Sequence, residues 1–336
     1  MRTKQTKSTK SIKSPRRAKS SKSADITRAK TAGPVSGAPR SSKALPITVS
    51  NPTKVFWPDG GYTKLQLIEF YADIFPKLQP YVKDRILSLE RCPDGMRGGC
   101  FYQKEAPSGM PPGTPTKEIA HVGKSAKSTN YVVGGSLATQ LALANLGCIA
   151  VHVSGSRDSS LRKPDWVCFD MDPQSGKFSD AARAGLRLKE VLDVLKLESF
   201  PKTSGSRGLH VFIPIKPETD VDEVLFFAES LVARLAAQFP KDLTVEHSIG
   251  ARKERVYLDA YRNGFGQTVV APYSVRRRPK APFSMPLSWS EVSPSLDPSE
   301  FNLGNYTKRL SAADPWQDFF RNRQPLSAAI NPLKKI

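Results

Sequence analysis

Two carboxylates end an apolar run in the stretch DWVCFDMDP at positions 165–173. A buried carboxylate is costly unless a cation accompanies it, so Asp170 and Asp172 require a basic partner or a metal ion. Side chains alternate across a strand, which puts both acids on one face with Cα atoms roughly 7 Å apart. Phe169 and Met171 then face the core. Carboxylates that share a face can also share hard divalent cations.

A third acid occurs in a similar setting downstream. In VYLDAY, at positions 256–261, Asp259 lies on the opposite face from Leu258 and Ala260. Three such acids complete a site for two metal ions ~3.5–4 Å apart, which can clamp the attacking and leaving oxygens in phosphoryl transfer. The DMDP sequence alone is also typical of a helix cap or a surface turn. The neighbouring motifs therefore have to decide its role.

The segment SGSRGLH, at positions 204–210, has the composition of an anion-binding loop. Its two glycines would let backbone N–H groups approach an anion, while Ser204, Arg207 and His210 offer side-chain donors. His210 alternates with apolar neighbours, which places it on the polar face of the following strand. Taken alone, it is equally consistent with a structural histidine.

Two further motifs indicate contact with nucleic acid or nucleotide. In YSVRRRP, Arg276 and Arg278 share one face opposite Arg277, and such a pair suits a triphosphate or a nucleic-acid backbone. In FYQK, Phe101 and Tyr102 precede a basic residue, a mixture that stacks a base beside a phosphate. The alternatives are a solvated charge run for the arginines and core packing for the aromatics.

Alternating strands and helices must position these motifs. We expect a helix capped by Thr63 that ends near Leu78, and a later helix capped by Ser179. The other expected helices span 136–146 and 222–239, and the expected strands span 100–104, 149–153, 209–215 and a segment near 256. This order predicts an α/β domain of two or three layers with a sheet that could be mixed.

Charge and composition separate one end of the chain from the rest. The 336 residues carry 51 Lys and Arg against 31 Asp and Glu, a net charge of +20. Residues 1–46 hold thirteen of these cations and one acid, among small polar residues that cannot form a core. We interpret 1–46 as a disordered basic arm that binds polyanions through counterion release, or else as a solubilising extension.

Cysteine usage and hydropathy indicate a protein that is neither secreted nor membrane-bound. The four cysteines form no CxxC pair, and the N-terminal region has no apolar segment of a secretory signal. We therefore expect free thiols in a reducing interior. No run of eighteen apolar residues occurs, which excludes a membrane span.

The motifs together match a known family. DWVCFDMDP, KTSGSRGLHVFIP and YLDAYRNGFGQTVVAPYSVRRRPKAPFSMPL, in this order, closely resemble the polymerase domain of bacterial ligase D, within the archaeo-eukaryotic primase superfamily. The resemblance begins at NPTKVFWPDGGYTK and covers roughly residues 46–300. It implies a primase-polymerase-like fold, with a central mixed β-sheet flanked by helices. The expected divisions are the basic arm at 1–46, a catalytic domain at 47–310 and a C-terminal extension at 311–336.

The resemblance also implies roles for individual residues. The implied metal ligands are Asp170, Asp172 and Asp259; the nucleotide-binding residues Ser204, Arg207, His210, His152, Arg276 and Arg278; the residues for a DNA 5′-phosphate Lys54, Lys64 and Asn51; and the template-stacking pair Phe101 and Tyr102. Relatives often have Trp two residues after the position of His152, where this chain has Ser154. The chain therefore departs from the family pattern next to His152.

The implied function is template-dependent nucleotidyl transfer by a DNA or RNA polymerase, with primase activity open. Such an enzyme extends or fills DNA ends or gaps that carry a 5′-phosphate, from NTP or dNTP substrates. The family favours ribonucleotides and two Mn²⁺ (or Mg²⁺) ions, and acts in non-homologous end joining with a Ku protein. A stand-alone polymerase would need a separate DNA ligase. The implied location is the bacterial cytoplasm, with the nucleoid.

Two other functions remain open from the sequence. A nucleotidyltransferase of the DNA polymerase β type would use Gly155 and Ser156 followed by the acids of DMDP, but Pro173 stands where that pattern expects a hydrophobic residue. In that case Ser156 should face the nucleotide at a helix start. The other alternative is a DNA-end-binding scaffold that has lost catalysis.

Overall fold

A computed structural model describes residues 45–120 and 127–334, with side chains as far as residue 330. Almost all of the predicted basic arm, 1–46, lies outside this part of the chain. The described residues belong to one compact unit with a continuous hydrophobic core. Within them, no helix combines the length and apolarity that crossing a membrane requires.

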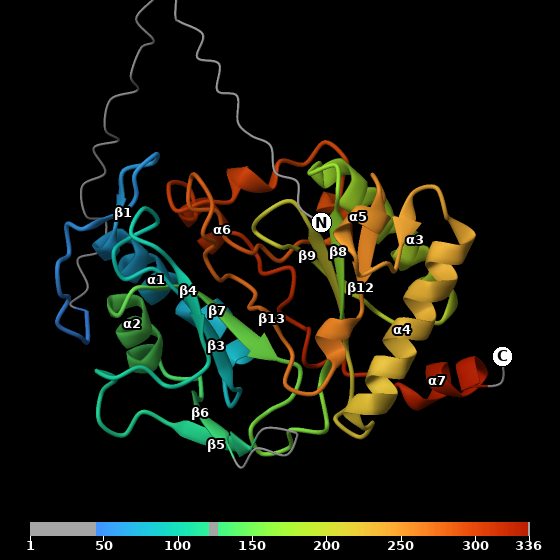
Figure 1. The fold of residues 1–336 in the computed structure, drawn as a ribbon, viewed down its shortest axis with the longest axis horizontal. Coiled ribbons are helices and arrows are strands. Elements are labelled where there is room, and N and C mark those ends of the chain that lie inside the picture. The colour runs from blue at the N-terminus through green and yellow to red at the C-terminus, as the bar shows by residue number, and fades with distance from the viewer. Residues whose placement is uncertain (1–44, 121–126, 335–336) are drawn as a thin grey trace, which may run out of the picture. The chain divides into compact units, whose positions relative to one another are not determined.

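Two sheets form the framework of the fold: the expected mixed sheet, with five strands, and a four-stranded sheet that the sequence did not indicate (Figure 1). The first has the order β11 (Leu243–Thr244), β12 (Val256–Asp259), β8 (Trp166–Pro173), β10 (Leu209–Pro214), β9 (Phe200–Thr203). It is mixed, because β11 and β12 are parallel and the other pairs are antiparallel. The mixed α/β class is confirmed.

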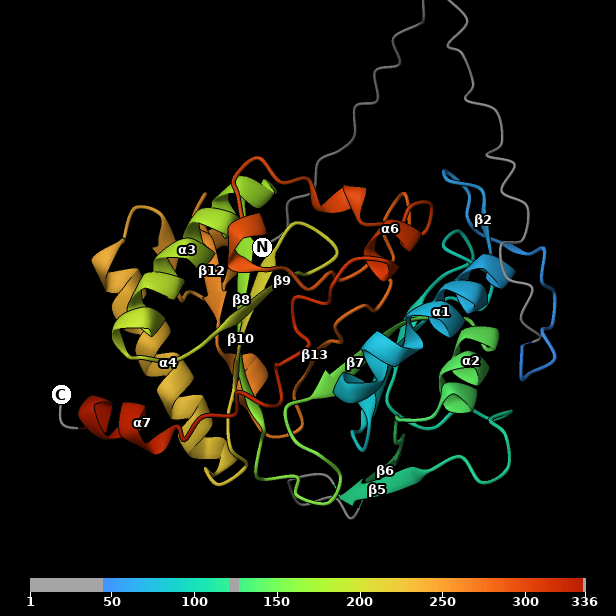
Figure 2. The same cartoon turned by 180° about the vertical axis from the view of Figure 1, so that it is seen from behind.

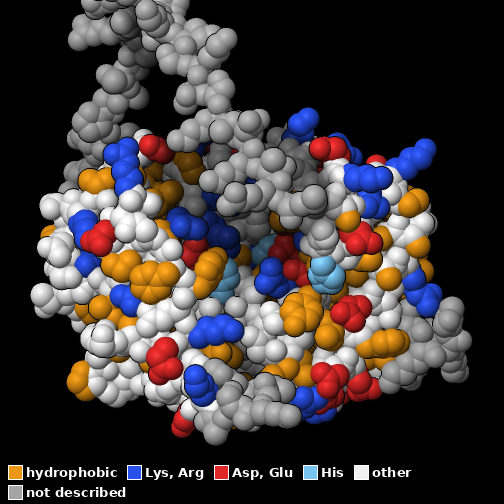
Figure 3. Space-filling view, in the orientation of Figure 1, with side chains coloured by type: hydrophobic (Ala, Val, Ile, Leu, Met, Phe, Trp, Pro, Cys, Tyr) orange, Lys and Arg blue, Asp and Glu red, His pale blue; other side chains and the backbone are white. Residues whose placement is uncertain are grey.

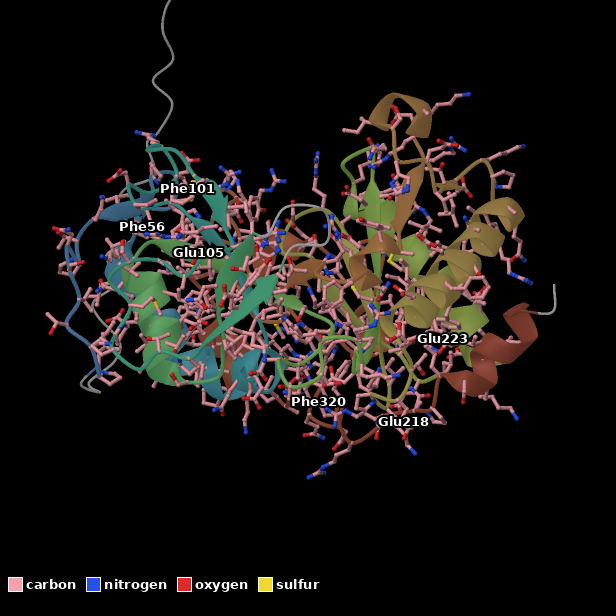
Figure 4. All side chains as sticks on the ribbon, turned by 60° about the horizontal axis from the view of Figure 1, so that its bottom comes forward. Phe56, Phe101, Glu105, Glu218, Glu223 and Phe320 are labelled. Atoms are coloured by element: carbon pink, nitrogen blue, oxygen red, sulfur yellow. A yellow bond between two sulfur atoms is a disulfide. The ribbon has the colours of Figure 1, made fainter. Side chains whose placement is uncertain are left out.

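The second sheet is antiparallel and carries the aromatic pair at its edge. Its order is β13 (Thr268–Val270), β7 (Cys148–Ser154), β3 (Leu87–Arg91), β4 (Phe101–Gln103). Two hairpins lie outside the main sheets, formed by β1 (Val55–Trp57) with β2 (Tyr62–Thr63) and by β5 (Thr116–Ala120) with β6 (Ser128–Val132). In Figure 4, Phe101 and Glu105 lie on the side of the second sheet, away from Glu218 and Glu223.

Each sheet has its own pair of helices (Figure 2). Helices α1 (Lys64–Val82) and α2 (Leu137–Asn145) pack together and against β7, while α3 (Phe178–Val194) and α4 (Val221–Gln238) cover β8 and its neighbours. The remaining helical segments are short: α5 (Ile249–Arg252), η1 (Tyr261–Asn263), η2 (Trp289–Glu291), η3 (Pro298–Glu300), α6 (Thr307–Leu310) and α7 (Ser327–Lys334).

Helix boundaries follow the predicted caps with two differences. Thr63 and Gln66 form the capping box of α1, as expected from the cap at Thr63. The helix continues past Leu78 to Val82, because Tyr81 and Val82 are buried against the core. The prediction that Ser179 caps the next helix is wrong: α3 begins at Phe178, whose ring is buried, and its cap residue makes no side-chain hydrogen bond.

The expectation of four free thiols is also wrong. Cys92 and Cys100 form a disulfide with Cα atoms 4.3 Å apart, whereas Cys148 and Cys168 are free and buried. The chain between the paired cysteines turns back on itself, and the Gly95 N–H donates to the Cys92 carbonyl at 2.9 Å. Cysteine spacing alone could not reveal this turn.

Residues after Leu310 complete the core. Trp316 and Phe319 are buried, and their rings stack with centroids 4.9 Å apart. The Trp316 indole N–H donates to the Pro201 carbonyl at 3.0 Å. This segment therefore packs on the first sheet, while the predicted domain boundary at 310 stays a prediction.

Candidate active site

Strand register brings four polar side chains into one row across the first sheet. His210 on β10 lies opposite Asp170 on β8 and opposite Lys202 on β9, and Asp259 on β12 lies opposite Asp170. Directly opposed residues project from the same face of a sheet. The row Lys202, His210, Asp170, Asp259 therefore lies on the face away from α3, and Asp172 follows two residues along β8.

Hydrogen bonds link the row and fix the histidine ring. The Lys202 Nζ lies 2.6 Å from the Ser284 Oγ and 3.0 Å from the His210 Nδ1. An ammonium only donates, so Nδ1 accepts, and we infer that Nε2 carries the proton facing the Asp170 Oδ1 at 3.2 Å. Burial lowers the pKa of His210 to about 4, which keeps this ring neutral near pH 7.

The acids have different electrostatic environments. Burial acts to raise the pKa of Asp170, but His210, Arg262 and Lys202 together lower it to about 2. Burial and the neighbouring Asp170 raise the pKa of Asp172. Burial also raises the pKa of Asp259, against the opposite effect of Arg262. The three acids therefore bring negative charges close together, and a cation beside them would reduce their mutual repulsion.

Arg262 supplies that cation in this structure. Its Nε lies 3.1 Å from the Asp259 Oδ2 and 4.0 Å from the Asp170 Oδ2. Across 45–120 and 127–334, no group of three His, Cys, Asp or Glu side chains could hold a metal ion as arranged. The carboxylate oxygens nevertheless fit a hard divalent cation in kind. Binding it would require Arg262 to release Asp170 and Asp259.

The loop before β10 is built differently from our expectation. The Ser204 Oγ accepts hydrogen bonds from the backbone N–H groups of Ser206 at 3.2 Å and Gly208 at 3.0 Å. In this structure the Gly208 N–H is engaged by Ser204, so the approach of these N–H groups to an anion stays a prediction. Gly205 has φ +69°, and a Cβ there would lie 2.5 Å from the Arg276 side chain. The glycines allow close packing, and Ser204 keeps its own O–H as a donor.

A cavity of about 520 Å³ collects most of the predicted residues between the two sheets. Its lining includes Asp170, Asp172, Ser204, Arg207, His210, His152, Arg276, Arg278 and Tyr102. Figure 3 shows basic, acidic and histidine side chains gathered in a hollow near the middle of that face. Asp259 does not line the cavity itself, but it contacts Arg262, which does.

The second sheet contributes His152 to this cavity. His152 on β7 lies opposite Ser88 on β3, and its ring meets the Tyr102 ring edge-on at 5.5 Å. Its Nε2 is buried without a hydrogen-bond partner among the described residues. Burial, followed by Arg276 and Arg262, holds the pKa of His152 well below its usual value. The ring is therefore neutral near pH 7 and keeps one buried nitrogen unpaired.

The three consecutive arginines divide as their alternation predicts. Arg276 and Arg278 line the cavity, whereas the Arg277 Nε pairs with the Glu90 Oε1 at 2.9 Å. Burial lowers the pKa of Arg278, and the repulsion from Arg276 and Arg207 adds to this effect. Crowded cations of this kind favour binding of a polyanion.

The residues implied for a DNA 5′-phosphate form a separate group. The Lys54 Nζ contacts the Asp94 Oδ1 at 2.5 Å and the Pro93 carbonyl at 2.9 Å, and the Lys64 Nζ contacts the Ser50 Oγ at 2.8 Å. Burial and the charge of Lys54 lower the pKa of Lys64. Asn51 is exposed in the same turn, with φ +48°. None of these residues lines the nucleotide-sized cavity.

The aromatic pair lies on the edge strand β4 of the second sheet, and one of its two rings reaches the cavity. Phe101 and Tyr102 on β4 are 47% and 60% exposed, which is high for large aromatic side chains. Tyr102 lines the cavity and Phe101 does not. Exposed aromatic rings at this edge can stack on bases.

Several site residues escaped the sequence reasoning. They are Lys202, Arg262, Ser88 and Thr268. Lys202 lies two residues before Ser204, where the recognised loop begins, and Arg262 follows Asp259 by three residues, so both lay next to a motif. Ser88 and Thr268 had no distinguishing pattern, because only strand pairing brings them to β7, where Ser88 lies opposite His152 and Thr268 opposite Ser154.

The polymerase β alternative is not supported by the position of Ser156. Ser156 forms an isolated bridge with Pro164 after β7, at no helix start, and does not line the cavity. Ser204 and His210 do line it. By the criterion set from the sequence, this arrangement favours the primase-like interpretation.

The fold and the site define a mixed α/β protein whose acidic strand end lines one cavity together with a group of arginines. The family of the LigD primase-polymerase domain matches residues 63–316, and the chain belongs to this family. It is 31% identical over 287 residues to the bifunctional non-homologous end joining protein LigD of Bacillus subtilis, covering 84% of this chain and 46% of the relative.

A second relative matches a similar part of this chain, and a solved structure has a similar fold. The multifunctional non-homologous end joining protein LigD of Pseudomonas aeruginosa is 30% identical over 327 residues, covering 91% of this chain and 38% of the relative. The chain thus spans less than half the length of these relatives. The polymerase domain of Mycobacterium tuberculosis ligase D, solved in complex with DNA, has TM-score 0.73 at 24% identity, covering 82% of this chain and 99% of the other. That likeness shows the fold.

Proposed function

We propose that this chain is a template-dependent nucleotidyltransferase, a DNA or RNA polymerase that extends or fills DNA ends in non-homologous end joining. The observation that carries this proposal is the cavity in which Asp170 and Asp172 face Arg207, Arg276 and Arg278. Acids and arginines that face each other across one cavity match the needs of a metal-bound triphosphate. Membership of the LigD primase-polymerase family supports the same chemistry.

The basic wall of the cavity binds and orients the nucleotide. Arg207, Arg276 and Arg278 hold the triphosphate, and the Ser204 hydroxyl donates to one of its oxygens. Donors fixed before the reaction stabilise charge without reorganising during it. Phe101 and Tyr102 stack on the template at the cavity edge.

The carboxylates of the first sheet supply the metal ligands opposite these arginines. Asp170, Asp172 and Asp259 would hold two divalent ions, Mn²⁺ or Mg²⁺, which activate the primer 3′-hydroxyl and neutralise phosphate charge when bound. Lys202 orients His210, and His210 in turn keeps Asp170 ionised and correctly turned. His152 offers its unpaired nitrogen to the nucleotide.

The finer assignments follow the family resemblance. Lys54, Lys64 and Asn51 bind the 5′-phosphate of a DNA end or gap, so the phosphate must displace Asp94 from Lys54. Ribonucleotides are the preferred substrates. Ku and a DNA ligase are the partners, and the bacterial cytoplasm, with the nucleoid, is the location.

The deciding experiment supplies a gapped duplex with a 5′-phosphate, Mn²⁺ and labelled ribonucleotides to the full chain. We expect template-directed extension that Asp170→Ala reduces to background while DNA-end binding persists. Asp193→Asn is the control, because Asp193 pairs with Lys189 on the surface of α3 and should extend normally.

Two results would count against the proposal. Extension that survives in Asp170→Ala would contradict the role given to that acid. A wild-type chain that binds DNA ends but never extends them would instead favour the non-catalytic scaffold. Replacing the ribonucleotides with deoxyribonucleotides in the same assay tests the sugar preference.

A further inference from the structure

A second cavity adjoins the nucleotide cavity behind two of its arginines. Its volume is about 460 Å³, within the ~300–1,000 Å³ usual for small-molecule sites. Ser206, Arg207 and Arg278 line both cavities. An anion held by Arg207 and Arg278 on one side could therefore pass to the other without losing these contacts.

The second cavity has an excess of unpaired positive charge. Arg207, Arg278 and Lys280 line it, and none of the three forms an ion pair within the described part of the chain. Asp297 is the one acid in its lining, and its oxygens accept from the backbone N–H and hydroxyl of Ser299, both at 2.9 Å. Three cations against one occupied carboxylate favour an anionic ligand.

The loop that carries Arg278 and Lys280 has a strained backbone and is closed by a backbone hydrogen bond. Lys280 and Ala281 are consecutive non-glycine residues at φ +65° and +51°. Such conformations cost energy and persist where the surrounding structure imposes them. Ala281 is fully buried, and the Arg276 N–H donates to the Pro282 carbonyl at 2.7 Å. The closed loop thus holds Arg276, Arg278 and Lys280 on one segment.

On the opposite wall of the second cavity, the Arg207 side chain packs closely against Gly176. Gly176 has φ +73°, and a Cβ on it would lie 2.8 Å from the Arg207 Nη1. The rest of that wall is small or apolar, formed by Gly205, Ser206 and Phe178. No exposed pair of aromatic rings like Phe101 and Tyr102 lines this cavity, so it is poorly suited to stacking bases.

We propose that this second cavity receives the inorganic diphosphate released by nucleotidyl transfer, with Lys280 as a ligand that the bound nucleotide does not share. The inference rests on the proposed function. In that reaction the primer 3′-oxygen bonds to the α-phosphorus and gives up its proton to solvent water. The α–β bridging P–O bond breaks, and its electron pair leaves with the diphosphate. Arg207 and Arg278 keep contact with the leaving group as it moves toward Lys280.

The test compares diphosphate product inhibition in wild type and Lys280→Gln, using initial rates of gap extension. We expect the inhibition constant for diphosphate to rise about fivefold, and by clearly more than the KM for the nucleotide. Asp297→Asn should shift the inhibition constant the other way, about twofold, because it removes the one negative charge. Lys241→Gln is the matched control, since Lys241 is exposed and lies outside both cavities.

Calorimetric titration of sodium diphosphate into the full chain, without DNA or nucleotide, separates this inference from the proposed function. Weaker binding in Lys280→Gln than in Lys241→Gln supports the cavity assignment, even if the wild type fails to extend DNA. Equal binding in the two variants overturns it. An equal rise in the nucleotide KM and the inhibition constant also overturns it, because Lys280 would then serve nucleotide binding.

Discussion

At the scale of single residues, the buried Lys202 orients the row of polar side chains on the first sheet. Lys202 is fully buried, donates to His210 and Ser284, and lies 5.6 Å from the centre of the Phe212 ring. Burial lowers its pKa from 10.5 to about 7, with Arg276 acting in the same direction and Cys168 and Asp170 opposing it. The row therefore contains an amino group whose charged form is costly to bury and which orients its neighbours through hydrogen bonds.

This burial predicts a specific pH dependence of stability. Between pH 7 and 10.5 the unfolded chain binds a proton at Lys202 that the folded chain has released. Lys202 should therefore contribute a rise in the free energy of unfolding with pH in this window, by at most about 1.4 kcal/mol per pH unit. Near the upper end of the window the buried thiols of Cys148 and Cys168, whose pKa values are raised, contribute in the opposite direction. Lys202→Met should lose this slope when urea unfolding is measured from pH 7 to 10.5.

Lys241→Met is the control for the pH measurement, because an exposed lysine should leave the slope unchanged. A wild-type slope identical to that of Lys202→Met would contradict the lowered pKa. A lower overall stability of Lys202→Met would not, since that variant also loses two hydrogen bonds.

At the scale of elements, the acid-bearing strand is held from the side by one asparagine. The Asn263 Oδ1 accepts from the Cys168 N–H at 2.8 Å, and its Nδ2 donates to the carbonyls of Cys168 and Ala260, both at 2.7 Å. Cys168 lies two residues before Asp170, on the same face of β8. Asn263 thus connects η1 to the strand that positions the acids.

Asn263→Ala should be strongly destabilising for its size. The substitution leaves the buried N–H and C=O of Cys168 without these bonds, so we expect a loss of about 2–4 kcal/mol in the free energy of unfolding. Chemical denaturation of both proteins measures it. Asn322→Ala, which removes a surface bond to Glu198, should cost less than about 1 kcal/mol. Similar losses in the two variants would contradict the role of Asn263 in connecting η1 to β8.

At the scale of the whole described molecule, distant segments meet around the start of β8. Asp165 pairs with Arg85, with Arg157 at 3.0 Å and with Arg323 at 3.0 Å. Arg323 belongs to the segment that carries Trp316 into the core. The residues after 310 therefore support the same strand that ends in the acidic pair.

Trp316→Ala tests whether this segment belongs to the folding unit. Removing a fully buried indole should cost about 3–5 kcal/mol and lower the midpoint of thermal unfolding in one cooperative transition. Phe226→Ala is the control, because Phe226 is 40% exposed on α4 and should cost less than about 1 kcal/mol. A stable Trp316→Ala variant would favour a separate C-terminal extension at 311–336.

Local patterns in the sequence determined the faces and the chemical types of the site. Alternation placed Asp170 and Asp172 on the face opposite Met171, and it separated Arg277 from Arg276 and Arg278, as the structure bears out. This was predictable because the side-chain period of a strand is a property of adjacent residues. The metal and DNA roles of these residues remain predictions from that pattern and from the family.

Only the tertiary structure decided which distant side chains meet. The register of β8, β9, β10 and β12 aligned Lys202 and Asp259 with Asp170, and the division into two sheets opened the cavity that faces His152. The pairing of Cys92 with Cys100 likewise depended on a turn. Register, sheet separation and turn geometry arise from contacts between residues far apart or from loop closure, which a periodic pattern does not encode. The sequence supplied the acids and arginines, and long-range pairing made them one site.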